Sequence, residues 1–305
     1  MKIKYKEHNF RKKTLALIET INSVISEYQR QGYTLTLRQT YYQLVARGFI
    51  ENSENSYERI GDTIDKARLA GLIDWEAITD RTRYLRSLSH WTTPAGIIDS
   101  ASYSYRLDKW AYQPNYIEVW IEKDALVDVI GKACTPLDVP YFSCRGYCSQ
   151  SAMWRAAQRF IDKVNHDGRY ILHLGDHDSS GVDMTRDIAD RLQLFGASVE
   201  VRRLALTPEQ IQIFNPPPAP AKESDSRTKQ YKKQHGDNVW ELDALEPQFI
   251  ERLVTNEIRS LMDDNIFAKT CELENAQQSE LQIISDNYSE ICTYLKHFTS
   301  DANCF

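Results

Sequence analysis

The stretch RYILHLGDHDSSGVDM, residues 169–184, decides the fold of this chain. It is largely apolar through Leu174, places Asp176 and Asp178 one residue apart, and continues through Ser-Ser-Gly into a helical pattern. A short apolar run that ends in a polar loop and opens a helix is typical of a parallel sheet. Residues two apart on an extended strand point to the same side, so we expect both carboxylates to face the edge of such a sheet.

Short apolar runs alternate with helical segments on both sides of this stretch. The expected strands cover residues 116–122, 139–144, 169–176 and 198–206, and the expected helices cover 124–133, 149–164 and 181–195. This order predicts a parallel sheet with helices on both faces.

Helical periodicity dominates the rest of the chain. The expected helices cover residues 10–30, 35–47 and 57–70, and each is closed by a glycine: Gly32, Gly48 and Gly71. Residues 87–114 form a Ser-, Thr- and Tyr-rich connector without a regular pattern, and the tail after Glu246 is helical. We expect an α/β protein in four parts. These are an N-terminal helical, winged-helix-like domain (1–95), a connector (96–115), a parallel-sheet domain (116–206), and a linker with a helical C-terminal extension (207–305).

Composition excludes several classes of protein. The chain has 305 residues, of which 42% are hydrophobic and 26% charged, which is typical of globular proteins. No apolar run approaches the roughly 20 residues needed to cross a bilayer, and the basic N-terminus lacks the apolar core of a secretory signal. The six cysteines have no spacing typical of a disulfide framework or a metal site, so we expect reduced thiols and a cytoplasmic location.

Charge is distributed unevenly along the chain. Residues 1–90 hold 15 Lys and Arg against 11 Asp and Glu, whereas the remaining residues hold 22 against 32. A basic first third indicates a polyanionic partner.

Acidic residues follow two of the expected strands. Glu122, followed by Lys123, ends the first strand, and Asp176 and Asp178 end the third. The carboxyl ends of parallel strands meet at one edge of a sheet, and three carboxylates there call for a cation. Hard oxygen ligands suit Mg²⁺ or Mn²⁺, and the helix that opens at Ser179 can bind a phosphate at its N-terminus. The alternatives are that Asp178 or Ser179 only caps that helix, and that Glu122 and Lys123 form a surface ion pair.

The helix in TLTLRQTYYQLVARG, residues 34–48, carries a second set of candidates. Thr36 can cap it, and a buried stripe is expected at Leu37, Tyr41, Leu44 and Val45. Tyr42 lies at the margin of that stripe, with Arg38 one turn before it. A phenol of pKa about 10 needs a neighbouring cation to act as a nucleophile, and Arg38 could supply that cation and bind a phosphate. Alternatively, Tyr42 only covers the edge of the core.

Residues 116–205 resemble a Toprim domain. VWIEKDAL (Val119–Leu126) is similar to a segment of the A subunit of topoisomerase VI and of its meiotic relative that makes double-strand breaks. Arg145-Gly146-Tyr147 resembles the Gly-Tyr segment of that family, and Arg38-x-x-Tyr-Tyr resembles its active-site segment. A free-standing A-subunit-like protein of the kind carried by mobile elements fits this resemblance.

The resemblance implies a function for each match. Glu122, Asp176 and Asp178 would be ligands of Mg²⁺ or Mn²⁺, and Tyr42, with Arg38 and Lys123, would form the catalytic set. The substrate would be double-stranded DNA. The protein would be a homodimer, in which the tyrosine of one subunit meets the metal of the other. A separate ATPase subunit would drive any strand passage, because the sequence contains no nucleotide-binding motif of its own.

Further residues are candidates for DNA contact. The helix over residues 57–70 follows a loop, as in a helix-turn-helix, and DRTRYLRS, residues 80–87, is a candidate wing. Arg81, Arg83 and Arg86, together with Arg145, are available for phosphates. In WELDAL (Trp240–Leu245), Glu241 and Asp243 either extend the acidic crevice or lie on an exposed strand face.

Three hypotheses follow. The chain is a tyrosine transesterase that cuts duplex DNA, a Toprim nuclease that hydrolyses DNA with metal-activated water, or a DNA-binding protein that has lost the chemistry. The presence of both candidate sets favours an enzyme.

Overall fold

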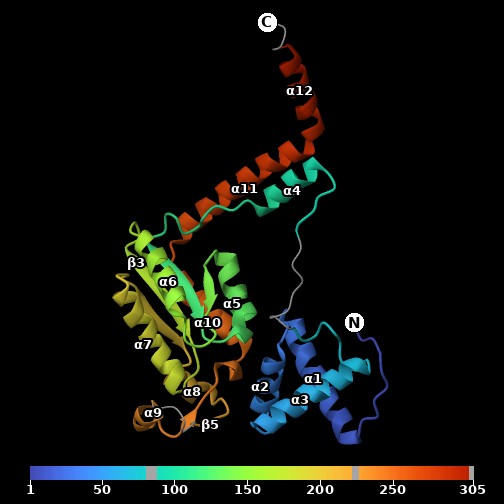
Figure 1. Ribbon diagram of the computed structural model, residues 1–305, viewed down its shortest axis with the longest axis vertical. Helices are drawn as coiled ribbons and strands as arrows, with labels where there is room; N and C mark the ends of the chain where they lie inside the picture. Colours follow the sequence, from blue (N-terminus) through green and yellow to red (C-terminus); the bar gives the residue numbers. More distant parts are fainter. Residues whose placement is uncertain (80–87, 222–226, 302–305) are drawn as a thin grey trace. The chain divides into compact units, whose positions relative to one another are not determined.

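The computed structural model describes residues 1–79, 88–221 and 227–301. The chain forms two compact units (Figure 1). Met1–Arg83 and Asn115–Ser260 make the first unit, and Tyr84–Pro114 and Leu261–Phe305 make the second. This grouping differs from the four consecutive parts expected from the sequence. The chain is an α/β protein, with N-terminal helices, a four-stranded parallel sheet with interleaved helices, and C-terminal helices.

Three helices begin the first unit: α1 (Lys12–Arg30), α2 (Leu37–Ala46) and α3 (Glu54–Leu69). They lie close to the expected ranges because local signals define their ends. Thr36 caps α2 by accepting from the backbone N–H of Gln39, whose side chain accepts in return from the backbone N–H of Thr36. The glycines after these helices have φ between 72° and 78°, a conformation that favours glycine.

The sheet contains β1 (Asn115–Ile121), β2 (Tyr141–Ser143), β3 (Gly168–Leu174) and β4 (Glu200–Ala205) in the order β2-β1-β3-β4. All neighbouring strands are parallel, which confirms the predicted sheet. The 3₁₀ turn η1 (Asp124–Leu126), the helix α5 (Val127–Cys134), the 3₁₀ turn η2 (Thr135–Leu137) and the helices α6 (Gln150–Asp162) and α7 (Ser179–Leu194) lie between the strands in sequence. Ile121 at the end of β1 pairs with Leu174 at the end of β3. The loops after these two strands therefore start side by side.

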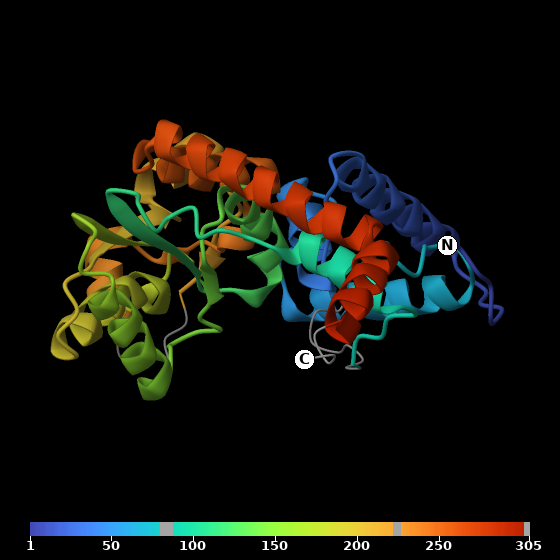
Figure 2. The same cartoon turned by 90° about the horizontal axis from the view of Figure 1, so that it is seen from above.

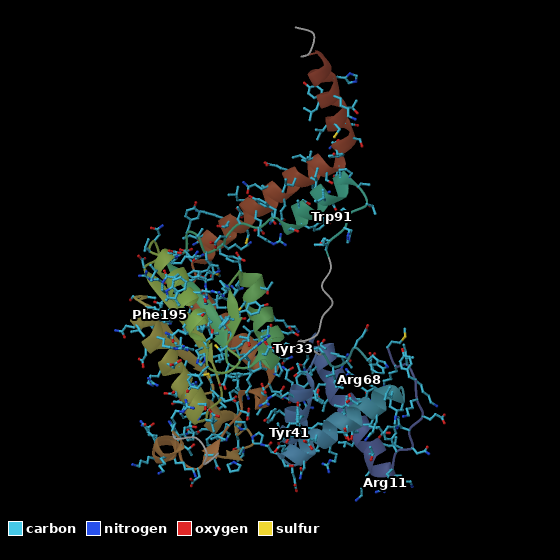
Figure 3. All side chains as sticks on the ribbon, in the orientation of Figure 1. Arg11, Tyr33, Tyr41, Arg68, Trp91 and Phe195 are labelled. Atoms are coloured by element: carbon cyan, nitrogen blue, oxygen red, sulfur yellow. The ribbon has the colours of Figure 1, made fainter. Side chains whose placement is uncertain are left out.

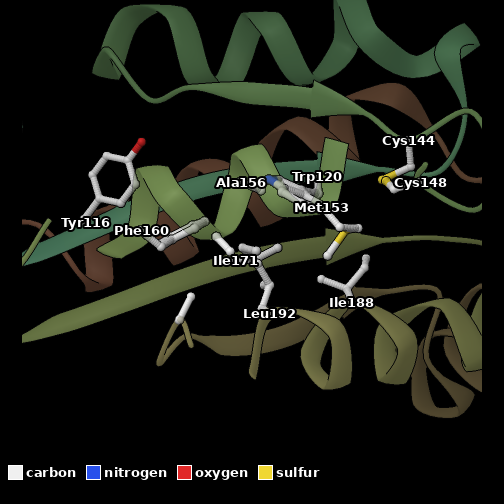
Figure 4. Packing of buried hydrophobic residues seen from close by; sticks show 12 residues of the cluster. Tyr116, Trp120, Cys144, Cys148, Met153, Ala156, Phe160, Ile171, Ile188 and Leu192 are labelled. Carbon is white, nitrogen blue, oxygen red and sulfur yellow. The ribbon is translucent and has the colours of Figure 1, made fainter. Parts of the chain in front are cut away.

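Helices α6 and α7 pack on one face of the sheet (Figure 4). Trp120 and Ile171 of the strands are buried there together with residues of the two helices: Met153, Ala156, Phe160, Ile188 and Leu192. The strand residues that alternate with Trp120, such as Val119 and Ile121, are fully buried on the opposite face. Both faces of the sheet are therefore covered, as the run of apolar residues in each strand predicts.

One acidic residue, Glu118, is buried within the face covered by α6. Arg159 donates two hydrogen bonds of 2.9 Å to its carboxylate, and Tyr116 Oη and Trp120 Nε1 donate two more. A buried carboxylate is tolerated when its oxygens are paired in this way. This ion pair could not be predicted from the sequence, because its partners come from a strand and a helix about 40 positions apart.

The first unit ends in shorter elements. These are α8 (Pro208–Phe214), the paired strands β5 (Ala219–Pro220) and β6 (Asn238–Val239), α9 (Thr228–His235), the 3₁₀ turn η3 (Leu242–Ala244) and α10 (Pro247–Ser260). The segment from Glu241 to Asp243 leads into and forms η3, and Leu242 and Asp243 are buried. Asp243 therefore does not lie on an exposed strand face.

The second unit is helical. Its α4 (Pro94–Ser104) lies along α11 (Asp264–Asp286), and α12 (Tyr288–Asp301) follows (Figures 1 and 2). Lys109 Nζ lies 2.7 Å from Glu274 Oε2 and ties the segment after α4 to α11. The prediction of an irregular connector over residues 87–114 is wrong at α4, which Thr93 caps and Pro94 begins. Within residues 1–79, 88–221 and 227–301, no helix has the length and apolar character needed to span a membrane.

Candidate active site

Acidic side chains gather at the edge of the sheet where β1 and β3 end. Glu122 follows β1, and its Oε2 accepts a 2.9 Å hydrogen bond from the backbone N–H of Asp176, which follows β3. Glu241 and Asp243 approach from the segment around η3, where the backbone N–H of Leu242 donates to Asp176 Oδ1 at 2.8 Å. The structure thus brings Glu122 and Asp176 together and adds the two acidic residues near η3.

The ammonium of Lys123 lies among three of these carboxylates. Its Nζ is 2.7 Å from Asp176 Oδ1 and 3.5 Å from Asp243 Oδ2, and it also pairs with Glu241. The Lys123 side chain is only 12% exposed, so a surface ion pair does not describe it. Burial alone would lower the pKa of Lys123, but the charges of Asp176, Asp243 and Glu241 outweigh burial and raise it. Lys123 therefore stays charged.

Asp178 has a structural partner of its own. It is the N-cap of α7, and its Oδ1 accepts a 2.6 Å hydrogen bond from the backbone N–H of Gly181. Strand β3 ends at Leu174, so the extended alternation expected for Asp176 and Asp178 does not continue through both residues. The interpretation of Asp178 as a helix cap therefore holds, although its charge also acts on Glu122.

Two glycines allow Glu122 to lie so close to this loop. A Cβ on Gly175 would lie 2.8 Å from Glu122 Oε2, and a Cβ on Gly181 would lie 3.0 Å from it and 2.2 Å from the carbonyl oxygen of Asp176. Any side chain at either position would displace the carboxylate or the loop.

Arg203 of β4 holds the loop that follows β3 through three hydrogen bonds. It is not among the residues predicted from the sequence. Its guanidinium donates to the carbonyl oxygens of Gly175, Asp176 and Gly181 at 3.0, 2.5 and 2.7 Å. Burial lowers the pKa of Arg203, while the charges of nearby carboxylates raise it. The feature of the sequence that could have identified Arg203 is its position within a strand expected to be buried.

Helix α2 brings Arg38 to the same acidic residues. Arg38 Nε donates to Asp243 Oδ2 at 2.8 Å and Nη2 donates to Glu241 Oε2 at 3.0 Å. The guanidinium carbon lies 5.3 Å from the centre of the Tyr42 ring, and Lys123 Nζ lies 5.9 Å from it. One chain therefore places the predicted catalytic set beside the acidic cluster, whereas we expected the two sets to meet across a dimer.

Tyr42 is more buried than its position on α2 predicted. It is 8% exposed, because α2 packs on η3 as well as on α1 and α3. Burial and the charge of Glu241 raise the pKa of the Tyr42 phenol, and together they outweigh Arg38 and Lys123, which lower it. Arg38 lowers the pKa of Tyr42, as expected for an activating cation, but burial raises this pKa by more.

Contacts away from the cluster hold the N-terminal helices in this position. Tyr33, which lies between the N-terminal helices and α5 (Figure 3), donates to Glu251 of α10. Lys132 of α5 places its ammonium 3.4 Å from the centre of the Tyr33 ring. Tyr28 donates to Glu246 at 2.5 Å. These contacts fix the position of α2 relative to η3.

The composition of the cluster fits a divalent cation. Five carboxylates (Glu122, Asp176, Asp178, Glu241 and Asp243) face three cations (Arg38, Lys123 and Arg203), which is a formal excess of two negative charges. Asp243 Oδ1 is buried and has no hydrogen-bond partner among the described residues. Carboxylate oxygens are the ligands that Mg²⁺ and Mn²⁺ prefer.

In the observed arrangement, the ammonium of Lys123 lies among the oxygens of Asp176, Glu241 and Asp243. Within the ranges that the structure describes, no three His, Cys, Asp or Glu side chains form a group that could hold a metal ion. The reason is visible in the contacts: Asp176, Glu241 and Asp243 turn toward Lys123, and Asp178 turns toward α7. The chemistry of the donors fits the predicted metal, and the metal itself stays a prediction.

Arg145 pairs with a residue outside the acidic cluster. Arg145 has a φ of 53° and pairs with Asp124 at 3.0 Å, with most of its side chain exposed. The next residue, Gly146, donates its N–H to the carbonyl oxygen of Glu122 at 3.3 Å. The candidate wing with Arg81, Arg83 and Arg86 lies outside the described residues.

No family model, curated protein or solved structure matches this chain. The function is therefore inferred from the residues of this chain and their geometry.

Proposed function

We propose that this protein cuts double-stranded DNA by tyrosine transesterification, as a topoisomerase VI A-subunit-like protein with a winged-helix-like domain and a Toprim domain. One observation carries the proposal. Arg38 bonds to Glu241 and Asp243 while its guanidinium lies 5.3 Å from the ring of Tyr42. This contact supports the proposal because it links the helix of the proposed nucleophile to two residues of the acidic cluster, Glu241 and Asp243, that are about 200 positions away in sequence.

In this proposal the Tyr42 oxygen attacks a DNA phosphorus atom. A phosphotyrosine bond forms, the bond from phosphorus to the sugar oxygen breaks, and that oxygen leaves as the hydroxyl of the other DNA end. The phenol must lose its proton during the attack, and its raised pKa makes this loss costly. Arg38 and Lys123 both lower that cost, and they would also balance the charge of the phosphate.

Glu122, Asp176 and Asp178 would hold the Mg²⁺ or Mn²⁺ ion, with Glu241 and Asp243 as further acidic groups. When bound, the ion would stabilise the negative charge that develops on the scissile phosphate. The Asp178 side chain would have to give up part of its role as the cap of α7.

Cutting both strands of a duplex requires two nucleophiles. A chain with one nucleophilic tyrosine therefore acts as a pair, and we retain the homodimer as part of the proposal. A separate ATPase subunit is needed only if the protein also passes DNA through the break. Helices α2 and α3 would dock on the duplex. The protein would act on DNA in the cytoplasm.

A hydrolytic Toprim nuclease is the second candidate. The observation that favours it is the burial of Tyr42, which is 8% exposed and has a raised pKa. In that case Tyr42 packs α2 against η3, and only the acidic cluster takes part in cleavage.

Trapping the cleaved DNA separates these candidates. Supercoiled plasmid is incubated with the protein and Mn²⁺, quenched with detergent, and analysed with and without protease. Transesterification predicts cut DNA that stays bound to protein until protease is added, and no cut DNA from the Tyr42→Phe variant. Free DNA ends, or cleavage by Tyr42→Phe, would exclude the tyrosine mechanism. Loss of cleavage in Asp176→Ala and Glu122→Ala, but not in Tyr42→Phe, would then favour the nuclease.

A further inference from the structure

Lys123 is placed where a metal ion would compete with it. Its ammonium contacts the carboxylates of Asp176, Glu241 and Asp243, which come from two segments about 65 residues apart in sequence. Arg38 also reaches Glu241 and Asp243, but from outside, with 42% of its side chain exposed. Lys123 is thus the more buried of the two cations that contact these carboxylates.

The ammonium of Lys123 does not pair with every oxygen of these three carboxylates. Asp243 has a side chain with no exposed surface, and its Oδ1 has no hydrogen-bond partner within the described part of the chain. A buried acceptor without a partner is costly. Together, the vacant acceptor and the excess of negative charge indicate that a cation with more charge and more coordination positions than an ammonium can bind here.

We infer that Lys123 is an internal counter-ion, which a divalent cation displaces when it binds to Asp176, Glu241 and Asp243. This inference rests on the metal binding in the proposed function, and it adds the second acidic segment as ligands and Lys123 as the competitor. In the absence of metal, Lys123 offsets part of the negative charge of these three carboxylates, of which Asp176 and Asp243 are buried. When a divalent ion binds, one positive charge leaves and two enter.

Metal affinity measured without DNA tests the exchange. Mn²⁺ is titrated calorimetrically into the wild-type protein, Lys123→Gln and Lys123→Arg, with Lys66→Gln on the exposed face of α3 as the matched control. Because a unit charge a few ångströms from a cation contributes several kcal/mol at the effective dielectric of a protein, we expect Lys123→Gln to bind Mn²⁺ at least about tenfold more tightly. Lys123→Arg should bind no more tightly than the wild type. Unchanged or weaker binding by Lys123→Gln would overturn the inference, as would an absence of Mn²⁺ binding in both proteins.

A second measurement uses the wild-type protein, in case Lys123→Gln does not fold. The reaction of each lysine with an amine-modifying reagent is followed by mass spectrometry, with and without saturating Mn²⁺. Lys123, whose side chain is 12% exposed, should react slowly without metal and several times faster with it, whereas Lys66 should not change. Continued protection of Lys123 at saturating Mn²⁺ would overturn the inference. Neither measurement involves DNA cleavage, so a failed cleavage assay and a failed exchange are distinguishable.

Discussion

The adjacent tyrosines of α2 provide a matched pair for separating chemistry from stability. Their rings lie 5.2 Å apart, and each can be changed to phenylalanine with loss of a single oxygen. The Tyr41 hydroxyl accepts a 2.9 Å hydrogen bond from the backbone N–H of Ser53 and donates to Asn52 or to the carbonyl oxygen of Ser53 at 3.1 Å. The Tyr42 hydroxyl has no hydrogen-bond partner among the described residues.

Tyr41→Phe should therefore lower the stability more, and Tyr42→Phe should lower the yield of linked DNA more. Tyr41→Phe removes the hydrogen bond to the N–H of Ser53, the N-cap of α3, which should cost about 0.5–1.5 kcal/mol of unfolding free energy. Tyr42→Phe removes no hydrogen bond to a described residue, so its cost should stay below about 1 kcal/mol. In the trapping assay the order reverses: Tyr41→Phe should still form protein-linked DNA, and Tyr42→Phe should form none.

Urea unfolding followed by tryptophan fluorescence gives the stability of both variants, and gel analysis with and without protease gives the yield of linked DNA. If Tyr42→Phe is the less stable variant, the environment assigned to its hydroxyl is wrong. If Tyr42→Phe still yields linked DNA, another residue is the nucleophile.

Three further outcomes are expected. Asp176→Ala and Glu122→Ala should each abolish Mn²⁺-dependent plasmid cleavage while duplex binding in a filter assay stays largely unchanged; cleavage at wild-type rates by both would exclude the acidic cluster from the chemistry. Burial lowers the pKa of His173 from 6.5 to about 3, so the unfolded chain takes up this proton first and stability is lost as the pH falls below 6.5. Unfolding free energy should decrease by about 2 kcal/mol between pH 6.5 and 5 through this group, and His173→Gln should remove that part of the slope in urea titrations at several pH values. Gly181→Ala should destabilise the protein by about 1–3 kcal/mol. The control Gly61→Ala should not, because its Cβ would meet its nearest neighbour at an ordinary 3.5 Å. Equal unfolding midpoints for the two variants would show that the loop around Asp176 can shift at little cost.

Local signals in the sequence were sufficient for most of the fold. The strands were predicted from apolar runs, and the first helices from caps and terminal glycines such as Thr36 and Gly48. These features depend on residues a few positions apart, so the chain carries them before it folds. The missed helix α4 has a local cap at Thr93 as well, but its Ser- and Tyr-rich composition gave no helical pattern.

The sequence by itself determined a parallel sheet with acidic residues after two of its strands, because strand ends in such a sheet must meet at one edge. Only the tertiary structure decided what those residues contact. Long-range packing placed η3 between α2 and the sheet edge, which buried Tyr42, paired Arg38 with Asp243, and set Lys123 among the carboxylates. Such contacts join segments up to about 200 residues apart. Their energies come from burial and charge pairing across the fold, which no window of the sequence contains.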